Sequence, residues 1–116
     1  MAAIRLSEIA FARSGDKGNA SNVGVVARQP EFYPVLEKYL TVGLVKAHFQ
    51  GICRGPVDRY ALPNLNALNF ILHDSLGGGG SESLRTDAQG KSHALMMLEL
   101  VMEVAEEDLP AGWNPA

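Results

Sequence analysis

Short apolar runs of the kind that form β-strands occur in the first 28 residues and again around Pro63. Residues 4–13 and 22–28 mix β-branched and aromatic residues with polar ones, and the polar segment between them contains two glycines. This pattern predicts a strand, a loop and a second strand that together form a hairpin. Residues 57–62 and 67–73 flank Pro63 in the same way, so we expect a second hairpin there.

The period of the pattern changes over residues 30–52, where apolar residues recur at spacings of three and four. That spacing places them on one face of a helix, which we expect in two pieces. Thr41 is suited to cap the second piece, because its hydroxyl can accept a hydrogen bond from a backbone N–H in the first turn. Gly51 is suited to end the helix.

The carboxy-terminal third predicts a further helix and a further strand. Thr86 or Asp87 is suited to cap a short helix that runs through Met97. Apolar residues then alternate with polar ones from Leu98 to Val104, which predicts a fifth strand.

The resulting order is β-β-α-β-β-α-β, and its last six elements are those of a ferredoxin-like sandwich. We therefore expect an α+β fold, a ferredoxin-like two-layer sandwich (β-α-β-β-α-β) with an added amino-terminal strand. If successive elements alternate in direction, the connections at 14–21, 51–56 and 74–86 all lie at one edge of the sheet.

Composition narrows the class of protein. The chain has 116 residues, which fits one domain, and a formal net charge of −3 with ten scattered Lys and Arg residues, which argues against nucleic-acid binding. Cys53 is the single cysteine, so no internal disulfide or multi-cysteine metal site is expected. No targeting segment or long apolar run is visible, so we expect a cytoplasmic protein that does not bind membranes. We expect no cofactor and no metal.

The first glycine-bearing segment is a candidate anion-binding loop. Glycines allow backbone N–H groups to form a concavity for an anion, and Lys17 would add positive charge. The alternative is a tight hairpin connection whose Asp and Asn side chains satisfy their own backbone. The candidate ligand-binding residues here are Ser14, Gly15, Asp16, Lys17, Gly18, Asn19 and Asn22.

The second candidate segment contains four consecutive glycines, Gly77, Gly78, Gly79 and Gly80. They indicate either plain mobility or a close approach of the backbone to a ligand. The residues that follow suit a phosphate or carboxylate, because an arginine can bind such a group with two hydrogen bonds. The further candidates are Ser81, Arg85 and Lys91.

His73 is the candidate for proton transfer, since it ends an apolar strand beside the glycine segment. The alternative is a structural histidine that is held by hydrogen bonds. His48 lies on the apolar side of its helix and is expected to pack, and we assign no role to His93. Three scattered histidines without paired carboxylates do not make a metal site. Cys53 follows the end of a helix, so a nucleophilic role is not expected.

Several ordered motifs resemble those of the carboxy-terminal ferredoxin-like domain of the AtuA-like (acyclic terpene utilisation) proteins. The motifs are Arg13-Ser14-Gly15-Asp16-Lys17-Gly18-Asn19 with Asn22-Val23-Gly24-Val25, Arg59-Tyr60-Ala61-Leu62-Pro63-Asn64 through Leu68-Asn69-Phe70, Leu76-Gly77-Gly78-Gly79-Gly80-Ser81, and Asp87-Ala88-Gln89-Gly90-Lys91. The resemblance covers most of the chain to about residue 104, so we expect an AtuA-like domain at 1–105 and an acidic, proline-containing tail at 106–116. The term ferredoxin-like describes the topology and implies no iron.

The resemblance implies a link to the catabolism of acyclic terpenes or branched acyl-CoA compounds. In longer members this region follows a large amino-terminal domain that this sequence does not contain. We therefore expect a small subunit or accessory domain that binds a larger AtuA-like partner and contributes an anion-binding edge for an acyl-CoA or carboxylate. Two alternatives remain: a stand-alone enzyme that uses His73 as acid or base, and a homo-oligomeric scaffold.

Overall fold

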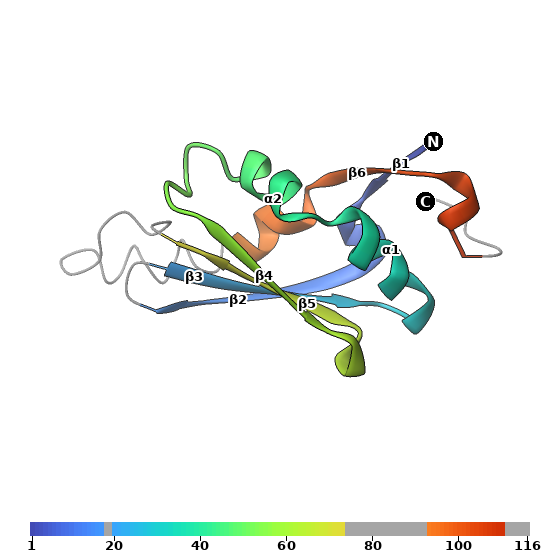
Figure 1. The fold of residues 1–116 in the computed structure, drawn as a ribbon, viewed down its shortest axis with the longest axis horizontal. Coiled ribbons are helices and arrows are strands. Elements are labelled where there is room, and N and C mark those ends of the chain that lie inside the picture. The colour runs from blue at the N-terminus through green and yellow to red at the C-terminus, as the bar shows by residue number, and fades with distance from the viewer. Residues whose placement is uncertain (18–19, 74–92, 111–116) are drawn as a thin grey trace.

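The computed structural model describes residues 1–17, 20–73 and 93–110, and of Asp16 and Lys17 only the backbone (Figure 1). The strands are β1 (Ala2–Arg5), β2 (Ala10–Lys17), β3 (Ala20–Ala27), β4 (Val57–Leu62), β5 (Ala67–Leu72) and β6 (Val101–Val104). The helices are α1 (Tyr33–Tyr39), α2 (Val42–His48) and a helix at 93–98.

Four of the strands form an antiparallel sheet in the order β2-β3-β5-β4, and both predicted hairpins are present in it. α1, α2 and the helix at 93–98 lie on one side of this sheet (Figure 1). β1 and β6 form a separate two-stranded sheet on that same side. The expected α+β ferredoxin-like fold is therefore confirmed.

The helical region divides in two at Thr41, as the sequence predicts. Thr41 has an extended backbone, and its Oγ1 accepts a hydrogen bond from Leu44 N at 3.2 Å. This bond satisfies one of the backbone donors that the first turn of α2 leaves without an intrahelical partner. Gly51 follows the helix with a φ of 92°, a left-handed conformation that glycine adopts without steric cost.

The prediction of a single strand over residues 4–13 is wrong, because the structure forms two strands there. A 3₁₀ turn at Leu6–Glu8 separates β1 from β2. The Glu8 carboxylate accepts a hydrogen bond from Arg5 N at 2.8 Å, and Leu6 N donates to Leu100 O at 2.8 Å. These bonds turn the chain, so β1 pairs with β6 while β2 pairs with β3.

The last strand is shorter than the alternating pattern predicts. Leu98 ends the helix at 93–98, and β6 begins only at Val101. Between them, Glu99 N donates to Met96 O and Leu100 N to Met97 O, both at 3.1 Å. Apolar residues at alternate positions also fit the end of a helix that continues into a strand, so the sequence pattern alone does not place this boundary.

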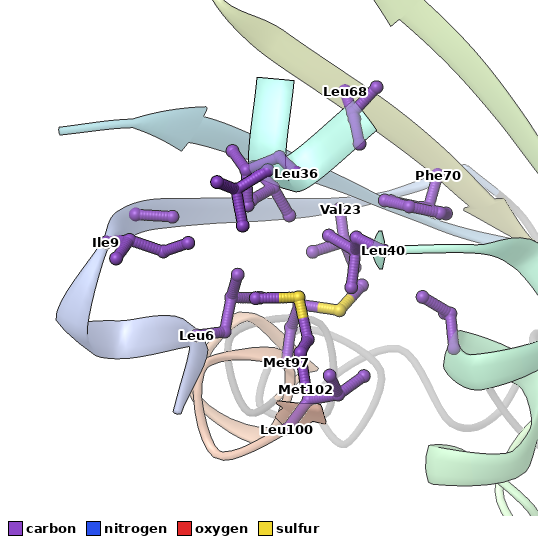
Figure 2. Packing of buried hydrophobic residues seen from close by; sticks show 14 of the residues in the cluster. Leu6, Ile9, Val23, Leu36, Leu40, Leu68, Phe70, Met97, Leu100 and Met102 are labelled. Atoms are coloured by element: carbon purple, nitrogen blue, oxygen red, sulfur yellow. The ribbon is translucent and has the colours of Figure 1, made fainter. Parts of the chain in front are cut away.

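The core lies between the four-stranded sheet and the layer of helices and β1–β6 (Figure 2). Val23, Leu68 and Phe70 extend from the sheet toward Leu36 and Leu40 of the α1 region. Burial of such side chains is the main favourable contribution to the stability of the fold. The residues that meet them from the opposite layer include Leu6, Met97, Leu100 and Met102.

Candidate functional site

One end of the four-stranded sheet gathers the chain segments that the sequence analysis singled out. β2 ends at Lys17 opposite Ala20, where β3 begins. Leu72 at the end of β5 lies opposite Ser21 on one side and Val57 on the other. This end of the sheet, where β2 and β5 end and β3 and β4 begin, is called the loop edge below. For the described residues, the predicted common edge is confirmed.

A histidine–carboxylate pair stands at the loop edge. His73 Nε2 lies 2.7 Å from Asp58 Oδ2, and the two side chains are 42% and 46% exposed. Because a carboxylate only accepts hydrogen bonds, Nε2 carries the hydrogen. In the neutral ring Nδ1 then carries the lone pair, and no partner for it is found within residues 1–17, 20–73 and 93–110.

The backbone of His73 is held by the turn that precedes β4. His73 N donates to Pro56 O, and Gly55 N donates to His73 O, both at 3.0 Å. Cys53 is buried, and its Sγ lies 3.2 Å from His73 O and 3.4 Å from Gly55 O. A buried thiol with carbonyl partners is a structural group, and these contacts give Cys53 a structural role.

The first glycine-bearing segment is mostly strand, which corrects the expected loop at 14–21. Ser14, Gly15, Asp16 and Lys17 belong to β2 and lie opposite residues 23, 22, 21 and 20 of β3. The connection is thereby reduced to residues 18–19. Backbone N–H groups that are paired in a ladder cannot also form an anion-binding concavity, so any anion contact from β2 must come from its side chains or its unpaired edge.

The remaining candidate residues fall in two groups. Asn22 is exposed on β3 and lies opposite Gly15 and Ile71. The residues of the other group lie outside the described residues, as do the suggested caps at 86 and 87. They are Gly18, Asn19, Gly77, Gly78, Gly79, Gly80, Ser81, Arg85 and Lys91.

A second histidine at the loop edge is buried and was missed by the sequence analysis. His93 Nδ1 lies 2.9 Å from Ser21 Oγ, and both residues are almost fully buried. Burial lowers the pKa of His93 below its ordinary value, since the charged ring would lose its hydration. The ring meets Phe49 edge to face at a centroid distance of 5.7 Å. His93 therefore belongs to the core as a neutral ring.

A small cavity borders Ser21. Its volume is about 180 Å³, and its described lining consists of Ala20, Ser21, Asn22 and Ile71. Typical small-molecule sites are larger, roughly 300–1,000 Å³. At this volume the cavity is large enough for a small chemical group rather than a whole cofactor.

His48 has the packing role that its place on the helix predicted. Its Nε2 donates to Met96 O at 2.6 Å, and its ring meets that of Phe49 at 5.3 Å. Over residues 1–17, 20–73 and 93–110, no three His, Cys, Asp or Glu side chains come together as a metal site. No helix in the same part of the chain is long and apolar enough to cross a membrane.

Asp58 is the other functional candidate that the sequence analysis missed, although the hairpin contains a signal for it. Asp58 lies opposite Ile71 in the ladder, which makes His73 its diagonal neighbour on the same face of the sheet. Diagonal neighbours are within reach of long side chains. Counting the register outward from the turn at Pro63–Leu65 would have placed the carboxylate beside the histidine.

The loop edge places a histidine and a carboxylate together at a partly exposed position. Asp58 orients the His73 ring through its bond to Nε2, which leaves Nδ1 as the ring nitrogen that faces away from the carboxylate. Arg54, which precedes β4, is exposed at the same edge and adds a positive charge. The described part of this edge thus combines the histidine–carboxylate pair with the cationic side chain of Arg54.

Fold and site together define a two-layer α+β domain with a histidine–carboxylate pair at one sheet edge. The chain matches the family of the AtuA ferredoxin-like domain over residues 4–103, and it belongs to that family. A search of curated proteins and a search of solved structures both give no match.

Proposed function

We propose that the chain is an accessory domain of AtuA-like function that holds an anionic acyl compound at the loop edge. The ligand class is an acyl-CoA or a carboxylate, and the pathway is the catabolism of acyclic terpenes or other branched acyl compounds. A larger AtuA-like domain, on the same or another chain, completes the site. Membership of the AtuA ferredoxin-like family supports the accessory role and the pathway that we propose. The geometry of the loop edge supports the ligand class.

The Asp58–His73 pair is the observation that carries the proposal. A half-exposed histidine held at 2.7 Å by a carboxylate is oriented for contact with a ligand and not buried as a structural group. The turn at 53–56 fixes the histidine backbone as well. Such double fixation keeps a binding or proton-transfer group in one geometry.

Cationic residues at this edge support an anionic ligand. Arg54 is exposed and precedes β4 at this edge. Lys17 at the end of β2 and Arg85, which lies outside the described residues, are the further cations that we assign to the ligand. A charged hydrogen bond contributes roughly 1.5–3 kcal/mol, so each such contact matters for affinity.

Binding of a branched short-chain acyl-CoA and of its free acid, measured by calorimetry, tests the ligand. Lys17→Ala, Arg85→Ala and His73→Gln should each weaken binding about tenfold or more without changing the unfolding midpoint. Glu103→Gln is the matched control, because Glu103 is exposed on β6 and away from the loop edge. Equal affinity in all five proteins would contradict the proposal.

The partner is tested separately, by native mass spectrometry of the chain after gentle purification from its own host. A co-purifying larger AtuA-like chain supports the accessory role. If the chain is isolated without such a protein and without a covalently attached large domain, the accessory role is contradicted.

A stand-alone enzyme is the second candidate function, and the orientation of the His73 ring favours it. With Nε2 bound to Asp58, Nδ1 is the atom that would take a proton from a bound substrate. Turnover of an acyl-CoA or carboxylate by the isolated chain, abolished in His73→Ala and reduced in Asp58→Asn, would establish this alternative. A His73→Ala protein with full turnover would exclude it.

A further inference from the structure

Apolar side chains are exposed on the face of the four-stranded sheet that is turned away from the helices. Phe11 on β2 and Tyr60 on β4 are both 52% exposed, and Leu62 on β4 is 41% exposed. Arg28 stacks on one side of Phe11, with its guanidinium carbon 4.1 Å from the ring centroid, and still leaves half of Phe11 in solvent. No described element lies against this face (Figure 1).

The ladder registers arrange this outer face in three rows of four positions. The first row contains Phe11, Val26, Ala67 and Leu62, and the second contains Arg13, Gly24, Asn69 and Tyr60. The third contains Gly15, Asn22, Ile71 and Asp58. Each row begins on the edge strand β2 and ends on the edge strand β4.

We propose that this outer face binds the same face of a second copy of the chain, across a two-fold axis parallel to the strands. Such an axis, placed between β3 and β5, sets β2 of one copy over β4 of the other. Phe11 then lies over Leu62 of the second copy, and Arg13 over Tyr60 of the second copy. Each contact occurs twice, as in any two-fold interface.

The paired residues complement each other chemically. Phe11 and Leu62 remove apolar surface from water, and an arginine over a tyrosine ring is a favourable cation–π contact. A crossing angle of about 30°, usual for stacked sheets, shifts these pairs by a few ångströms but keeps them within side-chain reach. The second copy is favoured as occupant because one face supplies both members of each pair.

The size of the face sets the strength of the dimer. Four strands about 4.8 Å apart and three rows about 6.7 Å apart cover roughly 400 Å² of flat area in each copy. Side chains make the accessible area larger than the flat area, which brings the pair to the small end of specific interfaces. We therefore expect a dimer with a dissociation constant in the micromolar range.

The dimer makes the loop edge a composite surface. Gly15 of one copy lies opposite Asp58 of the other, and Gly15 has no side chain to stand between them. The backbone near Lys17 of each copy thus approaches the Asp58–His73 pair of the other copy. The dimer itself does not depend on the function proposed for that pair.

Sedimentation equilibrium of the full chain between about 1 µM and about 1 mM tests the proposal. The wild-type chain should change from monomer to dimer across this range. Tyr60→Lys places a cation opposite Arg13 twice and should weaken the dimer at least tenfold. Within one copy, positions 60 and 13 are three strands apart, so this change leaves the monomer folded.

A charge exchange makes the test specific for the register. Adding Arg13→Glu to Tyr60→Lys creates two opposite-charge pairs across the axis and should restore dimerisation. Val101→Lys is the matched control, because Val101 is a strand residue of similar exposure, 45%, outside this face. It should dimerise as the wild type does.

Three outcomes would overturn the proposal. The first is a monomer at every concentration, and the second is a dimer that Tyr60→Lys leaves unchanged. The third is protection of β2 and β4 by a larger co-purifying protein in hydrogen exchange, since that protein would then be the occupant of the face.

Discussion

Gly55 lies in direct backbone contact with His73. Gly55 N donates to His73 O at 3.0 Å, and a Cβ atom built on Gly55 would lie 2.8 Å from that oxygen and 2.9 Å from His73 Cβ. Real Cβ atoms do not approach backbone oxygens so closely, and a carbonyl held in a ladder cannot move aside easily. Only glycine fits at position 55 without displacing the histidine.

Gly55→Ala should therefore destabilise the domain by about 1–3 kcal/mol, the usual cost of overpacking. Urea unfolding measures the free-energy change, and the shift of the His73 amide resonance reports the displacement of the turn. Gly43→Ala is the matched control, because a Cβ there meets nothing within 4 Å and Gly43 lies in α2. It should be neutral or stabilising, by up to about 1 kcal/mol. Equal effects of the two changes would contradict the contact.

Leu68 is fully buried between the sheet and α1, and the cavity left by its truncation should be costly. We expect Leu68→Ala to lower the free energy of unfolding by about 2–5 kcal/mol. Leu65→Ala removes the same atoms from a side chain that is 65% exposed and should change stability by less than about 0.5 kcal/mol. A small effect at Leu68 would show that this side chain is not in the core.

His93 should make stability fall on mild acidification. Its folded pKa is lowered by burial, so the unfolded chain binds a proton first as the pH falls below its ordinary pKa of 6.5. The contribution of neutral His93 is complete above about pH 6.5 and is lost progressively below it, by at most about 1.4 kcal/mol per pH unit. Urea unfolding between pH 5 and pH 8 measures the slope.

The His93→Gln variant provides the control for this slope, because glutamine does not titrate. Its stability should depend less on pH over the same range, whatever its stability at pH 8. Identical slopes in the two proteins would exclude His93 as the titrating group.

Hydrogen bonds of Asp108 connect the segment after β6 to the end of α1. Its carboxylate lies 2.8 Å from Lys38 Nζ and accepts a hydrogen bond from Tyr39 Oη, and the same hydroxyl accepts a hydrogen bond from Ala105 N at 3.2 Å. The bond to Lys38, followed by that to Tyr39, lowers the pKa of Asp108 below 3.8, and the bond from Asp108 raises the pKa of Lys38. The contact is therefore complete above about pH 4 and is lost on acidification through the lowered pKa.

Asp108→Asn should accordingly lower the hydrogen-exchange protection factors of residues 105–109 at neutral pH and remove the further loss of protection that acid causes in the wild type. Glu107→Gln is the matched control, since Glu107 is an exposed neighbour with the same chemistry. If Glu107→Gln accelerates exchange as much as Asp108→Asn, the effect is one of net charge and not of this contact.

Features that depend on neighbouring residues in the chain were predictable from the sequence. Both hairpins, the Thr41 cap and the glycine after α2 follow from local propensity and turn chemistry. The division of residues 4–13 was not predictable, because it depends on Leu100 O, which accepts from Leu6 N. A polar contact between segments far apart in the chain cannot be detected in the local pattern of apolar residues.

The same distinction applies to the loop edge. Asp58 and His73 belong to one hairpin, so their proximity follows from its register. Ser21 and His93 are 72 positions apart and meet only after the helix at 93–98 has packed on the sheet. A histidine at the start of a helix gives no sign in the sequence of whether it faces solvent or the core, which is why His93 was overlooked.

The pairing of β1 with β6 has a consequence for biosynthesis. Ala2 lies opposite Val104, so β1 has no ladder partner until nearly the whole domain has been translated. The β2–β3 hairpin can form much earlier, because its strands are adjacent in the chain. Until β6 has been translated, the apolar side chains of Ile4 and Leu6 therefore lack their packing partners from that strand. Apolar surface that is exposed during this interval favours aggregation or chaperone binding.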